Sequence, residues 1–530
     1  MFRKIGKLMC LGLTICLMAV TVASAEIGRI TTEPLTLDYW IPLGAKASQV
    51  ITSNAEIPVY DVFEEKTGVQ INWIHPSATD AGTQLSLMIA SQQLPDMIFY
   101  NWASFSGGLA KALSDNVIIP LNDLIDQHAP NYKALLDAHP ELRKQISLDD
   151  GTIALFPSAR TDMAVRVWFG PQIRQDWLDN VGKEIPKSIG DWYDVLKAFK
   201  ENDVNKNGDP NDEIPFVAAG ASNLNSYLLS FAGAYGLVRA DFCLKDGKVV
   251  FSPAEPAYKD FLTEMNKWYT EGLLDPDFAA VDGAGVKSLV TSNQAGAYFG
   301  SLAGNLGAYN TALQEVCPEG KIVGTPWAAG VAGIAYQNEA EHTKAYNGAG
   351  AVITTACKNV EAAVKWLDAH YSDEGSMLMN FGIEGLSYEM IDGYPTFTDL
   401  IANNPDGLAF DIAMSKYSLA ANTTEVMNQD AREFAQLSLR TDHQKAANKV
   451  WGSGDISLII PPTSLTIEES TEYSKIMSEI DTYVAESIVR FIMNQIPLED
   501  FDDFVNNLKT MKIDRAIEIR QQAYDRYMAR

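Results

Sequence analysis

The sequence is poor in the residues that build metal centres and disulfide frameworks. It contains 5 cysteines and 6 histidines in 530 residues, without a C-x-x-C pair or a zinc-binding histidine pattern. Cys10 and Cys16 lie in an N-terminal apolar run, which leaves Cys243, Cys317 and Cys357. Three cysteines at wide spacing exclude a disulfide framework, and one bridge or buried free thiols remain as alternatives.

Signatures of catalysis are also missing. There is no H-E-x-x-H, no G-x-S-x-G and no phosphate-binding glycine loop, so we expect the protein not to be an enzyme. If the protein were an enzyme, the alternative is a secreted glycoside hydrolase, which needs only two carboxyl groups about 5–9.5 Å apart. The 68 Asp and Glu residues leave room for such a pair.

Positive charge is scarce. Lys and Arg number 41 against those 68 acids, and the formal net charge is −27. A chain of this charge repels nucleic acid and anionic lipid, and it favours cations. Nucleic-acid partners are therefore excluded, and we expect most of the acids to form a solvated surface.

Long apolar runs are absent as well. The longest covers about 15 residues near the N-terminus, whereas a membrane span needs about 20. It follows a basic start and ends in Ala23-Ser24-Ala25, which predicts a signal peptide over 1–25, cleaved before Glu26. A lipoprotein signal with Cys16 as anchor is the alternative, but Ile15 stands where a small residue is expected. Cleavage removes three basic residues and no acid, so −27 − 3 gives −30. We expect a secreted, periplasmic or surface protein.

What the sequence does contain is an alternation of short strands and longer helices. Its first part predicts strands over 35–40, 69–74 and 96–101, with helices over 57–66 and 84–93 between them. This order is typical of an α/β fold with right-handed crossovers. A length of 530 residues indicates two or three domains.

The pattern continues to the C-terminus. Strands are predicted over 152–157, 297–299 and 321–326, and helices over 172–181, 191–202, 258–272 and 360–371. The first and last of these strands are expected to cross between domains. Apolar residues between Tyr473 and Phe491 recur every three or four positions and predict a long helix. A last helix is expected around 516–524.

The stretch DVNKNGDPNDEIPF, Asp203 to Phe216, has the composition of a calcium loop. Ca²⁺ binds six to eight oxygens, and a tight loop turns alternate side chains toward the ion. Asp203, Asn205 and Asn207 take the first, third and fifth positions, and Asp209 the seventh. An EF-hand would need an acid at the twelfth position, but that residue is Ile214 and the acids come earlier. We therefore predict a shortened, EF-hand-like structural site, with an Asx-rich turn that binds nothing as the alternative.

Several motifs together resemble the large extracellular solute-binding proteins of ABC importers. They are Ile173-Arg-Gln-Asp-Trp-Leu178, the Asp203 loop, Leu94-Pro95-Asp96, Tyr269 to Asp277 (YTEGLLDPD), Phe381 to Gly385 (FGIEG) and the tail Ala523 to Tyr527 (AYDRY). The resemblance spans the mature chain and is greatest to an oligosaccharide-binding subgroup similar to alginate-binding and LplA-type proteins. Its calcium ligands, carried over by position, are Asp203, Asn205, Asn207 and Asp209, with the last ones among Asn211, Asp212 and Glu213.

The resemblance also implies fold and partners. It implies an α/β, two-lobed periplasmic-binding-protein type II fold with hinge strands and a helical C-terminal region. The N-terminal lobe is expected over 26–157 and 323–393, and the C-terminal lobe over 158–322 and 394–530. A monomer of this kind captures an oligosaccharide or related polar solute by lobe closure and passes it to a membrane permease. A carbohydrate sensor would differ only in its partner.

Candidate ligand-binding residues come from aromatic side chains at strand ends, because sugars stack on aromatic faces and strand ends line clefts. The set comprises Trp40, Tyr100, Trp102, Trp168, Tyr298 and Trp327, with Glu384 and Tyr388 as further candidates in a glycine-flanked loop. Arg166, which follows the first predicted crossing, joins this set as a partner for an acidic ligand, with pairing to surface acids as the alternative. Ordinary core packing is the alternative for each residue taken alone. As a set, they are predicted to line the cleft.

Overall fold

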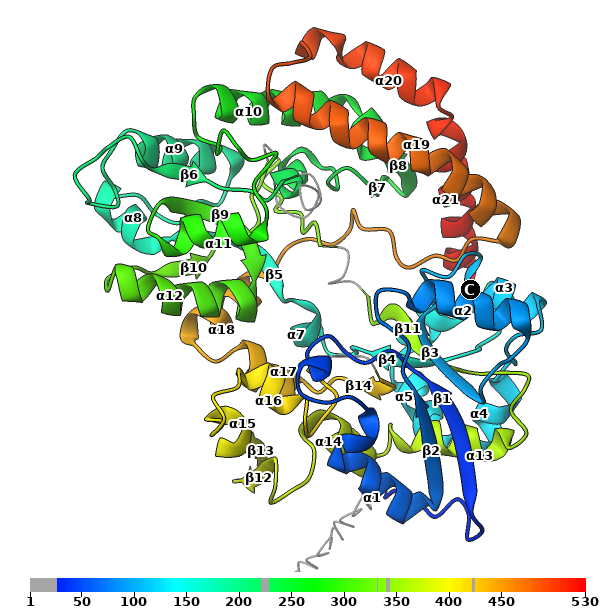
Figure 1. The fold of residues 1–530 in the computed structure, drawn as a ribbon. Helices are drawn as coiled ribbons and strands as arrows, with labels where there is room; N and C mark the ends of the chain where they lie inside the picture. Colours follow the sequence, from blue (N-terminus) through cyan, green and yellow to red (C-terminus); the bar gives the residue numbers. More distant parts are fainter. Residues whose placement is uncertain (1–25, 221–227, 331, 340–343, 422–424) are drawn as a thin grey trace, which may run out of the picture.

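The computed structural model describes residues 26–220, 228–330, 332–339, 344–421 and 425–530, so the predicted signal peptide lies outside the described residues. The chain folds into two lobes, one above the other in Figure 1, and each lobe has its own sheet and hydrophobic core. No described helix is both long and apolar enough to cross a membrane.

The first lobe is built on a six-stranded sheet of order β14-β4-β11-β3-β1-β2. Its strands are β1 (Leu35–Trp40), β2 (Val69–Ile74), β3 (Met97–Asn101), β4 (Phe156–Ala159), β11 (Tyr346–Ile353) and β14 (Met427–Asn428). β1 pairs in parallel with β2 and β3, whereas β11 runs antiparallel between β3 and β4. The chain therefore leaves this sheet after β4 and returns to it twice, to add β11 and then β14.

Helices surround this sheet. They are α1 (Pro58–Thr67), α2 (Ala81–Ser91), α3 (Gly108–Ser114), α4 (Asn122–His128), α5 (Pro130–Ala138), α6 (Pro140–Ile146), α13 (Val360–Ala369), α14 (Asp373–Phe381), α15 (Asp399–Ala402) and α16 (Phe410–Met414). α1 begins with Pro58, whose fixed φ suits a first helical position, and ends at Gly68, where φ is 75°. A hairpin of β12 (Tyr388–Ile391) and β13 (Tyr394–Phe397) completes the lobe.

The second lobe has a four-stranded sheet of order β10-β5-β9-β6. Its strands are β5 (Phe169–Arg174), β6 (Ile214–Phe216), β9 (Ala295–Ser301) and β10 (Ile322–Gly324), and α8 (Gln175–Val181), α9 (Ile189–Lys200), α10 (Pro256–Thr270), α11 (Gly283–Thr291) and α12 (Ala308–Val316) surround them. A Cβ at Gly170 would lie 2.4 Å from the Trp451 ring. The glycine is what lets α18 (Asp442–Trp451) lie directly on β5.

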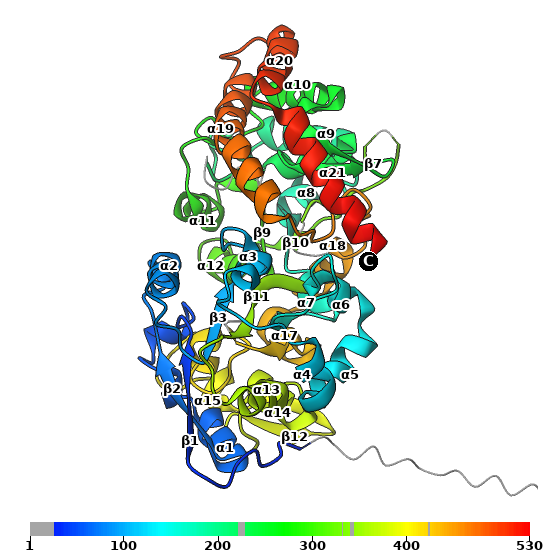
Figure 2. The same ribbon diagram turned by 90° about the vertical axis from the view of Figure 1, so that its right-hand side faces the viewer.

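Long C-terminal helices form an outer layer of the second lobe (Figure 2). They are α19 (Ile467–Ile492), α20 (Phe501–Thr510) and α21 (Ile513–Ala529), and a hairpin of β7 (Phe242–Lys245) and β8 (Lys248–Phe251) lies against α21. α19 buries Ile480, Ile488 and Phe491, members of the apolar stripe that predicted this helix. The prediction of a long helix followed by a last helix is confirmed.

The chain crosses between the lobes through α7 (Met163–Arg166) and through α17 (Ala431–Ser438) and α18. A further crossing follows from the described residues on either side of it, because Ala328 packs in the second core and Ala345 in the first. The first crossing lies between the end of β4 at Ala159 and the start of β5 at Phe169. The other two boundaries, at 322/323 and 393/394, are too early. Trp327 still packs in the second core, and residues from Phe397 to Met427 still pack in the first, because β14 returns to pair with β4.

Two local predictions also change. The predicted helix over 172–181 begins too early. The end of β5 takes up Gln172, Ile173 and Arg174, because this stretch pairs with β9 on one side and β10 on the other. The three cysteines beyond the predicted signal peptide are free thiols, with Cys243 and Cys357 buried. Of the two alternatives, one disulfide bridge or free thiols, the structure therefore supports free thiols.

Candidate functional site

A cavity of about 980 Å³ lies between the two lobes and is the larger of two candidate ligand sites. Its first-lobe wall comes from the loop after β1 and from the start of α16. Its second-lobe wall comes from the end of β9, the short helix η6 (Leu302–Gly307) and the start of α12. The segments around the first crossing at α7 and the last crossing at α17 and α18 also contribute lining residues. Because the crossing helices form part of its lining, a change in lobe angle would alter its shape.

Aromatic side chains of three different segments line this cleft: Trp168, Phe410 and Phe434. Trp168 is half-buried, packs edge-on against Phe169 at 5.8 Å, and accepts a hydrogen bond from Leu302 N on its carbonyl. Its buried indole Nε1 has no hydrogen-bond partner among the described residues. An aromatic face with an unused N–H donor suits a ligand that is apolar on one face and hydroxylated at its edge.

Polar side chains fill the spaces between these rings. The cleft is lined by Lys46, Arg160, Asp411, Gln429, Arg440, Thr441 and Gln444, with Ser301, Thr311 and Ser438. Gln444 Nε2 donates to Leu302 O over 2.9 Å and so ties α18 to η6. Mixed aromatic and hydrogen-bonding walls are the usual chemistry of a site for a polar organic ligand.

A buried carboxyl group lies next to this lining. Glu433 of α17 is fully buried and receives a hydrogen bond from Gln429 Nε2 at 3.2 Å. Burial raises the pKa of Glu433 to about 8. At neutral pH the group is therefore mostly protonated, and it adds little negative charge behind the cleft.

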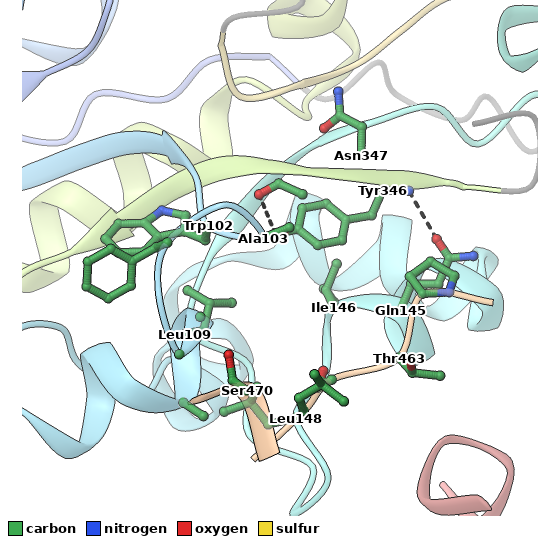
Figure 3. Close-up of a pocket in the computed structure, with 18 of the residues that line it drawn as sticks. Trp102, Ala103, Leu109, Gln145, Ile146, Leu148, Tyr346, Asn347, Thr463 and Ser470 are labelled. Atoms are coloured by element: carbon green, nitrogen blue, oxygen red, sulfur yellow. Dashed lines mark hydrogen bonds between the residues drawn. The ribbon is translucent and has the colours of Figure 1, made fainter. Parts of the chain in front are cut away.

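A smaller pocket of about 300 Å³ also lies between the lobes. Figure 3 shows Trp102, Gln145, Ile146 and Tyr346 of the first lobe around it, with Thr463 and Ser470 of the second. Tyr346 N donates to Gln145 Oε1 over 3.1 Å, and Trp102 Nε1 donates to Gly350 O over 3.1 Å. These polar groups are engaged within the protein.

The Asp203 loop folds around its own side chains. Asp203 accepts hydrogen bonds from the amides of Asn207 and Gly208, at 3.1 and 3.0 Å. Asp212 accepts from the side-chain amides of Asn205 and Asn207, at 3.1 and 2.7 Å. Four of the seven predicted calcium ligands are thus brought together, in a loop closed by Asp212 in place of a twelfth-position acid.

The remaining predicted ligands lie differently. Asp209 and Asn211 bond to each other, through Asn211 N and Asp209 Oδ1 at 3.1 Å. Glu213 is buried; its Oε1 accepts from Val204 N at 3.0 Å, and its Oε2 has no partner among the described residues. Burial raises the pKa of Glu213. No described group of three or more His, Cys, Asp or Glu could hold a metal, so a cation here would depend on asparagine oxygens too.

Comparison with known proteins identifies the family. Residues 46–377 match the model of the bacterial extracellular solute-binding proteins. The chain belongs to this family. FusA of Streptococcus pneumoniae, a fructooligosaccharide ABC transporter substrate-binding protein, is 28% identical over 502 residues, or 88% of this chain and 86% of FusA. Lipoprotein LipO of Bacillus subtilis is 25% identical over 465 residues, covering 84% and 85% of the two chains.

Solved structures agree on the fold of this solute-binding protein. The alginate-binding protein AlgQ2 matches with a TM-score of 0.71 at 24% identity, over 94% of this chain and 100% of AlgQ2. An extracellular solute-binding protein from Bifidobacterium longum subsp. infantis matches at 0.75 and 18%, over 94% and 99%. The predicted two-lobed α/β fold is confirmed. Family membership supports binding as the activity and gives no support to the hydrolase alternative.

The aromatic residues that the sequence predicted for the ligand site are dispersed in the solute-binding protein. Trp168 lines the larger cleft and Trp102 the smaller pocket. Trp40 and Tyr100 contact each other, with ring centroids 6.3 Å apart, but neither is among the residues that line either pocket. Tyr298 and Trp327 are buried in the second lobe. A ligand contact for these residues stays a prediction.

The other predicted contacts lie in different places. Arg166 is buried, donates from Nε to Arg160 O over 2.6 Å and pairs with Glu141 at 3.4 Å. Glu384 and Tyr388 lie at the β12–β13 hairpin, where Tyr388 packs against Phe381 at 5.6 Å. Arg166 therefore supports a crossing segment, and the hairpin residues are not among those that line either pocket.

Sequence reasoning missed most of the cleft. Lys46 lies in the loop after β1 and is not aromatic, so the rule that selected Trp40 does not find it. Phe410, Arg440 and Gln444 lie in short helices and turns around the last crossing, where no periodic pattern marks them. Only the return of the chain to β14 brings them beside Trp168.

Proposed function

We propose that this solute-binding protein is the substrate-binding component of an ABC transporter and that its solute is an oligosaccharide held in the larger cleft. The observation that carries the proposal is the cleft itself, which lies between two lobes and combines three aromatic rings with a set of hydrogen-bonding side chains. FusA, a relative over most of the chain, is a fructooligosaccharide-binding protein of an ABC transporter, which supports the same use here.

Lobe closure is the mechanism of this proposal. The three crossings would absorb the rotation, and α17 and α18 would carry Phe434 and Gln444 toward a saccharide stacked on Trp168. The membrane permease of the transporter would then receive the loaded monomer. The family is extracellular, and the predicted signal peptide supplies the export step. LipO is a lipoprotein, so attachment through a lipid is the alternative to free secretion.

A panel of oligosaccharides tests binding and catalysis together. Thermal unfolding should shift upward with at least one saccharide, because a ligand that binds only the folded state stabilises it. Chromatography of the same mixtures should show the saccharide intact. Accumulation of hydrolysis products at catalytic rates would overturn the proposal in favour of a glycoside hydrolase.

We also propose a structural Ca²⁺ in the Asp203 loop. The convergence of Asp203, Asn205, Asn207 and Asp212 supports it, as does the buried Glu213 Oε2, an acceptor that has no partner among the described residues. AlgQ2 has been solved without calcium ion and FusA as an EF-hand mutant, and both observations support a cation loop in this fold. The loop lies apart from the cleft in sequence and contributes no lining residue to it, so the ion would stabilise the second lobe only.

A further inference from the structure

The charge of the larger cleft is opposite to that of the protein. Over the whole chain, acids outnumber Lys and Arg by 68 to 41. Among the residues that line the cleft, the relation is reversed, because Lys46, Arg160 and Arg440 face a single acid, Asp411. A cleft of one sign between low-dielectric walls concentrates the field and attracts ligands of the other sign.

Lys46 and Asp411 largely cancel each other. Lys46 Nζ lies 3.1 Å from Asp411 Oδ2 and donates to Ala421 O over 3.0 Å. Glu433, behind the lining, is fully buried and adds little negative charge at neutral pH. Two arginines therefore determine the net charge of the cleft.

Arg440 is the one of these two that is placed to meet a ligand. It is exposed, and its guanidinium carbon lies 5.1 Å from the centroid of the Phe410 ring. No described carboxylate pairs with it, and its guanidinium makes no hydrogen bond to any described residue. Stacking on an aromatic ring fixes the plane of the guanidinium and leaves its N–H donors directed outward, as bidentate binding of a carboxylate requires.

We propose that the solute is an acidic oligosaccharide, and that Arg440 binds a sugar carboxylate while Trp168 stacks on the ring. This inference rests on the proposed function and narrows it from oligosaccharides in general to those that carry carboxylates. Arg160 adds to the attractive field, and Gln429, Thr441 and Gln444 supply partners for hydroxyl groups.

A pair of ligands that differ only in charge tests the proposal. Galacturonate trisaccharide and its fully methyl-esterified form share the same sugar rings, but only the first carries carboxylates. Calorimetric titration should give a Kd for the acid at least about tenfold lower than for the ester, as expected when charge-assisted hydrogen bonds are lost. The preference should shrink between 50 and 500 mM NaCl. An alginate trisaccharide, titrated in parallel, covers acids of another sugar.

Substitutions at Arg440 assign the effect to this residue. Arg440→Gln should raise the Kd of the acidic ligand about tenfold and leave that of the ester unchanged, and Arg440→Lys should restore part of the affinity because it keeps the charge but not the planar fork. Arg490→Gln is the matched control, since Arg490 is also exposed but lies on α19, outside the cleft. It should change neither Kd.

Failure of this inference differs from failure of the proposed function. Binding of neutral fructooligosaccharides with no binding of either acidic trisaccharide would overturn the inference and leave oligosaccharide capture standing. Equal affinity for acid and ester, or an unchanged Kd in Arg440→Gln, would overturn it as well. Absence of binding for every neutral and acidic saccharide would overturn both.

Discussion

Arg526 of the last helix donates from Nε to Oδ2 of Asp149 over 2.5 Å, and this ion pair fastens the second lobe to the first. Arg530 binds the same carboxylate and also the carbonyl of Ser147. Arg526 in turn pairs with Glu469 of α19 at 2.5 Å. The C-terminal helix is thus attached to the loop after α6 by charge-assisted bonds, in addition to the covalent crossings.

Removal of the Asp149 charge should loosen this attachment. We expect Asp149→Asn to lower the free energy of unfolding by about 1–2 kcal/mol, because two arginines lose a partly buried partner. Urea unfolding measures the change. Asp137→Asn is the control: Asp137 also binds two cations, Lys133 and Arg143, but within one lobe and at an exposed site. Equal effects of the two substitutions would contradict a special role of the interlobe pair.

Calcium removal should destabilise the second lobe. Chelation is expected to lower the free energy of unfolding by about 2–3 kcal/mol relative to calcium at a hundredfold excess over its Kd. Asp203→Ala should lower stability in calcium and abolish the response to chelator, whereas Asp406→Ala, an exposed acid of the first lobe, should keep that response. An unfolding curve that chelation does not move would contradict the structural ion.

Stability should depend on pH through a buried carboxyl group in the first lobe. Glu425 accepts hydrogen bonds from Tyr39 and Tyr60 at 2.7 and 2.9 Å, and burial raises its pKa to about 7. Because the folded state holds the proton more tightly than the unfolded state, its stability falls as pH rises from about 4.5 through 7. Glu433, with a pKa of about 8, also lowers stability as the pH rises. Burial lowers the pKa of His370 to about 4, so His370 contributes the opposite pH dependence, and its contribution to stability is lost as the pH falls.

The Glu425→Gln variant isolates the contribution of Glu425 to the pH dependence of stability from those of Glu433 and His370. The substitution keeps the shape of the side chain and removes its titration. Between pH 5 and 7.5 the unfolding free energy of the variant should therefore rise relative to the natural chain, by up to about 3 kcal/mol. A difference between the two proteins that does not vary with pH would refute the assignment.

The two pockets can be separated by their tryptophans. Trp168→Ala should weaken saccharide binding by about 1.5–3 kcal/mol, roughly ten- to hundredfold in Kd, because it removes a stacking face of the larger cleft. Trp102→Ala, in the smaller pocket, and Trp73→Ala, a half-buried tryptophan of β2, should change Kd little once the folded fraction is accounted for. A loss of affinity in Trp102→Ala alone would place the ligand in the smaller pocket.

Much of the fold could be predicted from periodicity. The strands at Leu35–Trp40 and Val69–Ile74 occur at the predicted residues, because alternation and flanking helices specify them locally. The strand at Gln172–Arg174 could not be predicted in this way, since it depends on pairing with β9 and β10. The position of the last lobe boundary could not be predicted either, because it depends on the two-residue strand β14, which pairs with β4 of the first lobe.

The site was harder to predict than the fold. Trp168 and Tyr298 were chosen by the same rule, but the first lines the cleft and the second is 1% exposed in the second lobe. Aromatic residues occur both in cleft walls and in hydrophobic cores, and only the packing of the two lobes determines which of these positions a given residue occupies. Phe410 and Arg440 meet through a cation–π contact between segments 30 residues apart (440 − 410), which no local pattern indicates.

A crystal structure with the saccharide that raises the unfolding temperature most is the direct test of the central claim. We expect an intact oligosaccharide between the lobes, with a sugar ring on Trp168 and the last-crossing helices α17 and α18 closed against it. A saccharide bound outside this cleft, or one cleaved in the crystal, would contradict it.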